Sequence, residues 1–269
     1  MRASATHQTR REFLRDLFDL EGRVAVVIGG TGFLCGAMAR GLWQAGCRVV
    51  LVGRNEGKAE SHFKAWGVGP ESARFWRADV TVRTEVESIL PAVTDWYEKI
   101  DIWVNGAGVV SPTPYNEISD DEFSQIIKVN LVSVHLGCQT VGKHWIEAKQ
   151  GGSLINMASM AAIRPLSRNF MYSVAKAAHW NLTQNLAREW APYGIRVNAI
   201  SPGFFPTPMN RAILDKSRVD AILGHTPMGR FGEPEELVGA TLLLASEKGG
   251  SFITGTNLVV DGGFAVTSI

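Results

Sequence analysis

Short apolar runs alternate with helical patterns along most of the chain, and this alternation is the feature that most constrains the fold. Runs that read as buried strands occur at 23–28, 48–52, 74–78, 100–104, 152–156, 195–200 and 257–260. Helical patterns between them include 55–66, 84–99, 120–129, 132–148, 170–190 and 233–245. Apolar strands that alternate with helices are typical of a parallel sheet covered on both faces. The sequence therefore predicts an α/β fold, with a doubly wound parallel sheet of about seven strands and helices on both faces.

Length and composition favour one domain. A chain of 269 residues with 45% hydrophobic and 20% charged residues can bury a sizeable core, and α/β folds of this length commonly form one unit. We find no internal repeat and no low-complexity linker. We expect a leader over residues 1–20 and a single domain over residues 21–269.

Charge and cysteine usage exclude several classes of partner. The net charge is +1, from 27 basic and 26 acidic residues, which gives no field for capturing nucleic acid or an anionic membrane. The three cysteines have neither metal-ligand nor disulfide spacing, which favours a reducing compartment. Residues 9–14 resemble a twin-arginine export signal, but no apolar segment follows. We therefore expect a cytoplasmic protein that binds neither nucleic acid nor membrane.

The least regular part of the chain runs from 201 to 232. It contains Pro202, Pro206, Pro208 and Pro227, and it would follow the carboxyl end of a strand, where open α/β sheets bind ligands. Long irregular excursions in compact domains are usually functional. We expect a substrate lid at about 203–232.

A hydroxyl, a phenol and an ammonium follow one another at a spacing that suits acid–base chemistry. Ser159 comes shortly after an apolar run, Tyr172 lies thirteen positions later, and Lys176 lies four positions further along a helical pattern. Residues four apart share a helix face, and a nearby cation favours the phenolate form. We interpret Tyr172 as a proton donor and acceptor, with Ser159 holding the reacting oxygen.

These residues resemble the catalytic signature of the short-chain dehydrogenase/reductase family, and further likeness follows in sequence order over about residues 20–264. The resemblance implies a Rossmann-type sheet, a nicotinamide cofactor and hydride transfer at a carbon that carries a hydroxyl or a carbonyl. It also implies that Asn130 completes a proton relay from Lys176. The expected catalytic residues are Asn130, Ser159, Tyr172 and Lys176. Members of the family are usually tetrameric or dimeric, so the resemblance implies a homotetramer or homodimer.

The glycine turn after the first predicted strand is expected to hold the cofactor's pyrophosphate, because glycine permits close approach and a helix N-terminus favours negative charge. Residues 28–36 match the family's Thr-Gly-x-x-x-Gly-x-Gly loosely and are closer to a Gly-Gly-x-Gly-x-Leu variant of its sugar-acid members. The expected cofactor-binding residues are Gly29, Gly30, Thr31, Gly32, Phe33, Leu34, Arg54, Asp79, Val80, Asn105, Gly106, Ala107, Tyr172, Lys176, Pro202, Gly203, Phe205 and Thr207.

Four positions in these motifs depart from the family pattern. Phe33 and Cys35 stand where the family has glycines, Ile28 stands where it has a threonine, and Gly106 replaces the second asparagine of Asn-Asn-Ala-Gly. A thiol near a helix N-terminus can have a lowered pKa, so one hypothesis is a reactive Cys35 beside the cofactor. The alternative is a small, inert residue.

Cofactor choice is predicted from the end of the second strand. An acid there would bind the ribose 2′-hydroxyl of NAD and repel a 2′-phosphate, but this chain has Gly53 followed by Arg54. A guanidinium can bind phosphate with two hydrogen bonds. NADP(H) is therefore favoured, with NAD(H) as the alternative if Arg54 only stacks on adenine.

Arginines near the catalytic residues suggest an acidic substrate. We expect Ser159, Arg164, Arg168 and Arg211 to contact it, because guanidinium binds carboxylate with two hydrogen bonds. The segments that carry these arginines are similar to D-mannonate oxidoreductase-like and gluconate 5-dehydrogenase-like members, which implies a sugar-acid substrate. The alternative for these arginines is that they form salt bridges between subunits or on the surface. For the whole protein, the alternatives are a 3-oxoacyl-carrier-protein reductase and a non-catalytic NADP-sensing regulatory protein.

The histidines have no ligand spacing, so we expect no metal.

Overall fold

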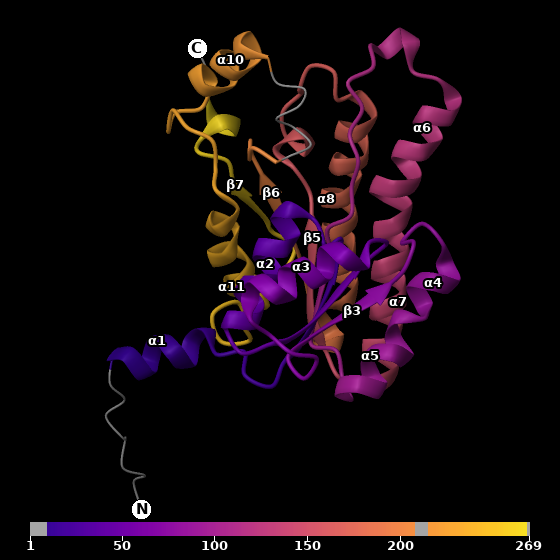
Figure 1. Cartoon of the computed structure of the whole chain (residues 1–269), viewed down its shortest axis with the longest axis vertical. Coiled ribbons are helices and arrows are strands. Elements are labelled where there is room, and N and C mark those ends of the chain that lie inside the picture. The colour runs from indigo at the N-terminus through magenta and orange to yellow at the C-terminus, as the bar shows by residue number, and fades with distance from the viewer. Residues whose placement is uncertain (1–9, 208–214, 268–269) are drawn as a thin grey trace, which may run out of the picture.

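The computed structural model describes residues 10–207 and 215–267, which form a parallel sheet between two layers of helices (Figure 1). Its strands are β1 (Val24–Ile28), β2 (Arg48–Gly53), β3 (Ala73–Arg77), β4 (Ile102–Asn105), β5 (Gly152–Met157), β6 (Ile195–Pro202) and β7 (Asn257–Val260). Within the described ranges these strands make one seven-stranded sheet in the order β3-β2-β1-β4-β5-β6-β7, and each neighbouring pair is parallel. The predicted doubly wound sheet is confirmed.

The longer helices of the described chain follow the predicted patterns, with differences at their boundaries. They are α1 (Arg10–Phe18), α2 (Phe33–Gln44), α3 (Glu56–Trp66), α4 (Arg83–Glu87), α5 (Ile89–Tyr97), α6 (Asp120–Ile127), α7 (Ser133–Ala148), α8 (Phe170–Trp190), α10 (Lys216–His225) and α11 (Val238–Ala245). The helix expected at 84–99 is divided at Ser88 into α4 and α5. A π-helical turn at Lys128–Val132 joins α6 to α7, and a 3₁₀ turn at Pro234–Leu237 precedes α11.

Side chains alternate across β1, so this strand contributes to both cores. Val24, Val26 and Ile28 pack into the core beneath α4, α5, α7 and α8. Ala25 and Val27 pack into the core on the other face, beneath α2, α3 and α11. Because every residue of β1 is buried, the strand is apolar throughout, as expected for a parallel sheet covered on both faces.

The strand order determines where a ligand site can form. The chain proceeds from β1 outward to β2 and β3 and then crosses back to β4 on the other side of β1. A crevice therefore opens at the carboxyl ends of β1 and β4, where the strand order reverses. Gly29 and Gly106 follow these two strands directly. Gly29 has a φ of 72°, and a Cβ there would lie 2.9 Å from Ala107 N, so the turn requires glycine.

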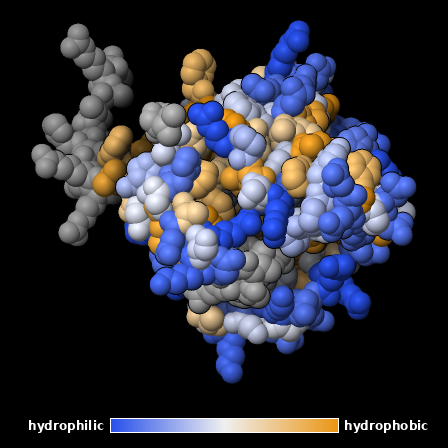
Figure 2. Space-filling view, turned by 90° about the horizontal axis from the view of Figure 1, so that it is seen from above, coloured by the Kyte–Doolittle hydropathy of each residue, from blue (hydrophilic) through white to orange (hydrophobic). Residues whose placement is uncertain are grey.

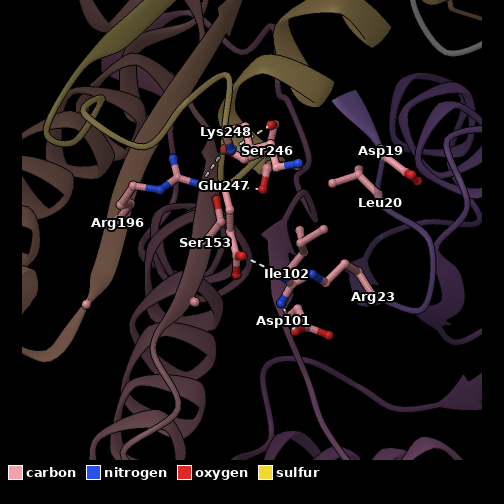
Figure 3. A pocket seen from close by; sticks show the side chains of 13 residues that line it. Asp19, Leu20, Arg23, Asp101, Ile102, Ser153, Arg196, Ser246, Glu247 and Lys248 are labelled. Carbon is pink, nitrogen blue, oxygen red and sulfur yellow. Dashed lines mark hydrogen bonds and ion pairs between the residues drawn. The ribbon is translucent and has the colours of Figure 1, made fainter. Parts of the chain in front are cut away.

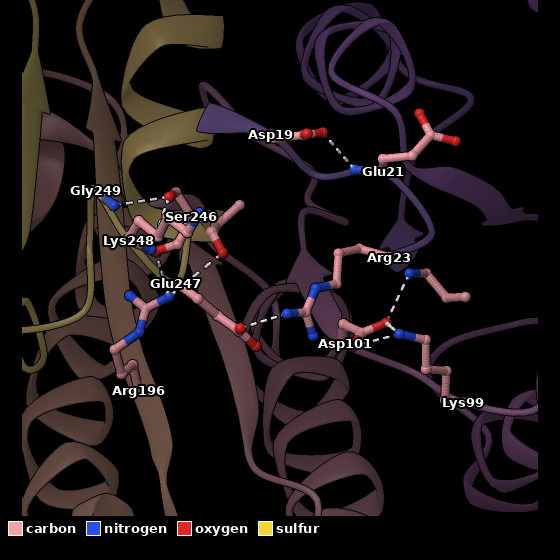
Figure 4. Close-up of polar contacts among 12 residues, drawn as sticks. Asp19, Glu21, Arg23, Lys99, Asp101, Arg196, Ser246, Glu247, Lys248 and Gly249 are labelled. Carbon is pink, nitrogen blue, oxygen red and sulfur yellow. Dashed lines mark hydrogen bonds and ion pairs between the residues drawn. The ribbon is translucent and has the colours of Figure 1, made fainter. Parts of the chain in front are cut away.

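At the opposite edge of the sheet a polar network joins the start of β1 to the chain after α11 (Figures 3 and 4). The buried carboxylate of Asp101 accepts hydrogen bonds from Arg23 Nη1 at 2.8 Å, from Val24 N at 2.8 Å and from Lys99 Nζ at 3.2 Å. Arg23 also pairs with Glu247. In this network the cationic side chains are paired with carboxylates, so its role is to join segments of the structure.

The α1 helix projects from the body beside this junction (Figure 1). Ser246 Oγ donates to the carbonyl oxygen of Leu17 at 2.6 Å, and Lys248 pairs with Asp16. Leu20, which follows α1, is buried in the core beneath α2. The described part of the proposed leader is therefore attached to the domain, and the division at residue 20 stays a prediction. None of the helices in the described ranges is long and apolar enough to cross a membrane.

Candidate active site

A cleft of about 570 Å³ runs along the carboxyl edge of the sheet, from the glycine turn after β1 to Lys176. Figure 2 looks onto this end of the molecule, where hydrophobic residues are interspersed among hydrophilic ones. The expected site residues that line the cleft are Gly29, Thr31, Gly32, Phe33, Leu34, Gly106, Ser159, Tyr172, Lys176, Pro202, Gly203, Phe205 and Thr207. Residues from five segments of the chain thus meet in one cleft, as the strand order requires.

Ser159 and Tyr172 lie together in the cleft. Ser159 follows β5 and begins a 3₁₀ turn at Met160–Ala162, where its Oγ accepts a hydrogen bond from Ala161 N at 3.1 Å. Ser201 Oγ, on β6, donates to the carbonyl oxygen of Ser159 at 3.0 Å and holds this turn against the neighbouring strand. Burial raises the pKa of Tyr172, and a hydrogen bond with the Ser159 side chain opposes that rise.

Lys176 lies one helical turn beyond Tyr172 on α8 and is buried. Its Nζ donates to the carbonyl oxygen of Met157 at 2.6 Å and lies 5.5 Å from the centroid of the Tyr172 ring. Burial lowers the pKa of Lys176 to about 8. The expectation that Lys176 lowers the pKa of Tyr172 is not met in this structure, because burial outweighs the other influences on the phenol.

Asn130 lies in the π-helical turn behind these residues and is fully buried. Its Nδ2 donates to the carbonyl oxygens of Val109 and Ile126 at 2.9 and 3.0 Å, and its Oδ1 accepts from Val109 N at 3.2 Å. π-Helical turns are often found at functional sites. The main-chain carbonyl of Asn130 contacts His179 Nε2. Asn130 is therefore connected to the other expected catalytic residues through His179.

The sequence analysis did not single out His179. It is buried on α8, and its Nδ1 lies 3.2 Å from the carbonyl oxygen of Met157, which also accepts from Lys176. Burial first, and then the nearby Lys176, lower the pKa of His179 to about 3. A neutral imidazole has one N–H, so it can donate to only one of the two carbonyl oxygens that it contacts.

The phosphate turn has the form that a dinucleotide needs. Gly32 begins α2 without a side-chain cap, so the first backbone N–H groups of α2 are available to an anion. At the end of β2, a Cβ on Gly53 would lie 3.0 Å from Thr31 Oγ1, which leaves little room for an acidic side chain. The turn and the length of the cleft therefore fit a nicotinamide dinucleotide.

The other expected cofactor residues do not line this cleft. Gly30 packs beneath the turn, since a Cβ there would lie 2.8 Å from Leu51 Cδ2. Asn105 is buried and donates to Asn156 Oδ1 at 2.9 Å, which joins β4 to β5. Asp79 accepts hydrogen bonds from the backbone and side chain of Thr81, which lower its pKa, and the charge of Arg54 acts in the same direction. Residues absent from the cleft lining are Gly30, Arg54, Asp79, Val80, Asn105 and Ala107.

The structure adds residues to the cleft that the sequence analysis did not identify. Lys58, Ser61 and His62 line it from one face of α3, and their spacing of three and four residues is the signal that could have grouped them. The remaining additions are Cys35, Gly108, Val109, Val110, Met157 and Ala158. Burial raises the pKa of Cys35 to about 11. Cys35 lies in the cleft, as the reactive-thiol hypothesis expects, but its pKa is raised where that hypothesis expects it lowered, which favours the alternative of an inert residue.

A second cavity of about 390 Å³ borders Ser159 and Tyr172, where a substrate could lie. Of the three arginines expected there, Arg168 lines it. Arg164 donates instead through Nε to the carbonyl oxygen of Ala265 at 2.6 Å, and Arg211 lies outside the described residues. Arg218, on α10, also lines the cavity. No local sequence pattern connected Arg218 with Arg168, because they are fifty residues apart.

Among the described residues, no group of three or more His, Cys, Asp or Glu side chains is arranged to hold a metal ion. At the end of the cleft that borders the second cavity, Tyr172 and Lys176 can move a proton, with Ser159 as a hydrogen-bonding partner. This set is suited to acid–base chemistry on an oxygen.

Comparison with known proteins agrees with this geometry. A family model described as enoyl-(acyl carrier protein) reductase matches residues 34–265. The chain is 35% identical over 249 residues to D-threitol dehydrogenase from Mycolicibacterium smegmatis, covering 93% of this chain and 95% of that protein. It is also 35% identical over 261 residues to 2-dehydro-3-deoxy-D-gluconate 5-dehydrogenase from Formosa agariphila, covering 94% and 96%.

Solved structures give the same result. The crystal structure of a gluconate 5-dehydrogenase from Burkholderia cenocepacia, in complex with NADP and tartrate, has a TM-score of 0.88 and 33% identity, and it covers 95% of this chain and 100% of that chain. The matches span nearly the whole length of each protein. The chain therefore belongs to the short-chain dehydrogenase/reductase family and is an NAD(P)-dependent oxidoreductase that acts on CH–OH groups.

Proposed function

We propose that the protein is an NADP(H)-dependent oxidoreductase that interconverts a secondary alcohol and a ketone on a sugar acid, of the D-mannonate/fructuronate or gluconate/5-ketogluconate type. The observation that carries the proposal is the cavity that Arg168 lines together with Ser159 and Tyr172. A guanidinium binds a carboxylate with paired hydrogen bonds. Relatives that act on sugar acids and on a polyol support this substrate class.

The catalytic roles follow from the contacts in the cleft. Ser159 orients the substrate oxygen, and Tyr172 gives a proton to that oxygen in ketone reduction or takes one in alcohol oxidation. A nicotinamide bound in the cleft supplies or accepts the hydride. Because burial keeps the phenol protonated, Tyr172 is prepared to act as the acid for ketone reduction. Oxidation requires its phenolate and should therefore be faster at alkaline pH.

Lys176 and Asn130 act behind the phenol. Lys176 is held by the carbonyl oxygen of Met157, and we assign it the binding of the nicotinamide ribose and the return of protons to Tyr172. Asn130 fixes the loop at Val109 through hydrogen bonds in both directions, and its contact with His179 extends the network to α8. Together these bonds hold the back wall of the cleft in one arrangement.

The preference for NADP(H) depends on the end of β2. An acidic side chain at position 53 would repel a 2′-phosphate, but Thr31 Oγ1 leaves little room for a side chain there. Arg54 follows Gly53 directly in the sequence. The proximity of the Arg54 charge to Asp79, whose pKa it helps to lower, supports a role for Arg54 in this region. We assign Arg54 to the 2′-phosphate, with Asp79 and Val80 beside the adenine.

We also keep the expectations of a substrate lid at about 203–232, a homodimer or homotetramer, and a cytoplasmic location. Gly203, Phe204 and Arg218 border the substrate cavity from the proposed lid, which supports the first. The free, buried state of Cys35, Cys47 and Cys138 is compatible with a reducing compartment.

The direct test is an assay with NADP(H) and NAD(H) on keto- and hydroxy-sugar acids, with a 3-oxoacyl thioester in parallel. We expect turnover of a sugar acid with NADP(H) as the better cofactor. Preferential reduction of the thioester would replace the proposal with a 3-oxoacyl-carrier-protein reductase. Dinucleotide binding without turnover on a broad carbonyl panel would favour a regulatory protein.

A further inference from the structure

We propose that Arg168 and Arg218 together form a carboxylate-binding subsite, through which the enzyme selects a hydroxy acid over a neutral polyol with the same carbon skeleton. The inference rests on the proposed function and makes it more specific, since it assigns the recognition of the acid to a pair of residues. Arg218 has no role in the resemblance from which the catalytic residues were identified.

The two guanidinium groups come from segments far apart in the sequence. Arg168 precedes α8, and Arg218 lies in the first turn of α10. Arg218 Nη2 donates to the carbonyl oxygen of Ser167 at 3.2 Å, which brings it to the segment that carries Arg168. Both residues line the same cavity of about 390 Å³ as Ser159 and Tyr172.

The charges in this cavity are unbalanced. Of the described residues that line it, none is acidic. Much of the remaining wall is apolar, with Val110, Met160, Leu166 and Phe204 among its residues. Two guanidinium groups without an acidic neighbour in the cavity wall are therefore suited to an anionic ligand.

The backbone is distinctive at Arg168 and constrained at the start of α10. Arg168 has a φ of 58°, a left-handed conformation that is unfavourable for a residue with a side chain. Such conformations persist mainly where the surroundings impose them, often at functional sites. The start of α10 is fixed by Asp215, whose side chain accepts a hydrogen bond from Arg218 N at 2.8 Å. The bond from Arg218 to Ser167 goes to a neutral carbonyl oxygen, and a carboxylate would be the stronger acceptor for the guanidinium.

The test compares tartrate with threitol, which have the same four-carbon diol core and differ in carboxylate against hydroxymethyl ends. Calorimetry would measure the affinity of each for the enzyme saturated with NADP⁺. We expect wild type to bind tartrate at least about tenfold more tightly, since charge-assisted hydrogen bonds are the stronger ones. Arg218→Gln should weaken tartrate binding roughly tenfold and leave threitol binding unchanged. Arg218→Lys should be intermediate, because lysine keeps the charge but not the planar fork.

The matched control is Lys216→Gln, which removes the same charge from the same first turn of α10 at an exposed position outside the cavity lining. It should leave both affinities within about twofold, because exposed charges are screened by salt. Equal losses of tartrate affinity in Arg218→Gln and Lys216→Gln would overturn the inference. Equal losses of affinity for tartrate and threitol in Arg218→Gln would also overturn the inference. A wild-type enzyme that binds tartrate no more tightly than threitol would overturn it as well.

A parallel turnover assay separates this inference from the proposed function. If wild type oxidises sugar acids but Arg218→Gln keeps the full preference for tartrate, the subsite fails while the sugar-acid activity stands. If wild type oxidises only neutral polyols and binds no tartrate, both fail together. Arg168→Gln should show the same selective loss as Arg218→Gln if the two residues act as one subsite.

Discussion

Cys35 and Gly106 are complementary in the crevice between β1 and β4: a Cβ at position 106 would overlap the sulfur atom of Cys35. Both are positions at which the chain departs from the family's motifs, and the two departures fit each other sterically. The thiol occupies space that a side chain at 106 would need. With the pKa of Cys35 raised to about 11 by burial, its role is to fill space.

Gly106→Ala should therefore lower the free energy of unfolding by about 2 kcal/mol, because the added methyl group overpacks the crevice. Cys35→Ala should restore part of that loss in the double variant, with a coupling of about 1 kcal/mol in a double-mutant cycle by urea unfolding. The rescue is expected to be partial, since the new Cβ would still lie 2.9 Å from the carbonyl oxygen of Ile28. If the changes in the free energy of unfolding are additive in the double variant, Cys35 and Gly106 are not sterically coupled.

Tyr172→Phe should reduce turnover by roughly 10²- to 10⁴-fold, because the phenol is the group that exchanges a proton with the substrate. Cofactor affinity should stay within about twofold, since the ring that packs beside Lys176 is kept. Stopped-flow turnover and dinucleotide titration give the two quantities. Tyr115→Phe is the matched control, because Tyr115 is 60% exposed and lines neither the cleft nor the substrate cavity. Near-normal turnover in Tyr172→Phe would refute the assignment.

Lys176→Met should stabilise the protein at neutral pH. Burial lowers the pKa of Lys176 from 10.5 to about 8, so the folded state releases this proton at a lower pH than the unfolded chain does. The cost of the buried charge is present in full below about pH 8 and disappears as the pH rises to about 10.5. At about pH 7 the variant should gain up to roughly 3 kcal/mol.

Urea unfolding of both proteins at about pH 7 and about pH 10 checks the sign. The advantage of the variant should shrink at the higher pH. A difference that stays constant, or grows, with pH would show that Lys176 is not held with a lowered pKa.

Arg54→Gln should weaken NADP⁺ binding by roughly tenfold or more and leave NAD⁺ binding nearly unchanged, because a charge-assisted contact with the 2′-phosphate is lost. Calorimetry with both dinucleotides measures the difference. Arg40→Gln, which removes an exposed charge from α2 outside the cleft lining, is the control. Equal weakening of both dinucleotides by Arg54→Gln would instead indicate stacking of Arg54 on the adenine.

Asp101→Ala should lower the free energy of unfolding by about 2 kcal/mol, because it leaves Val24 N without its acceptor and removes the pairing with Arg23 and Lys99. Glu247→Ala should cost less than about 1 kcal/mol, since that side chain is 63% exposed. Neither change should alter turnover, because the network lies at the opposite edge of the sheet from Tyr172. A loss of activity in folded Asp101→Ala would contradict this separation.

Some boundaries could not be read from periodicity. The expected helix at 84–99 contains Pro91, which is the third residue of α5. Proline is tolerated in the first turn of a helix but not in its interior, so the segment begins a new helix after Ser88. The π-helical turn at Lys128–Val132 depends on Asn130, whose side chain bonds the carbonyl oxygen of Ile126. That bond depends on the loop at Val109, which also binds Asn130 and which no local pattern reveals.

Local sequence patterns were sufficient to predict the sheet, the order of its motifs and the position of Lys176 beside Tyr172. Those properties depend on neighbours in the chain: strands buried on both faces are apolar throughout, and residues one helical turn apart share a face. Tertiary structure alone decided which arginines reach the substrate cavity and how Cys35 accommodates Gly106. The Arg164 side chain donates a hydrogen bond to the carbonyl oxygen of Ala265, whereas the Arg218 side chain donates one to the carbonyl oxygen of Ser167. The direction of a long side chain depends on packing between segments that only the folded chain brings together.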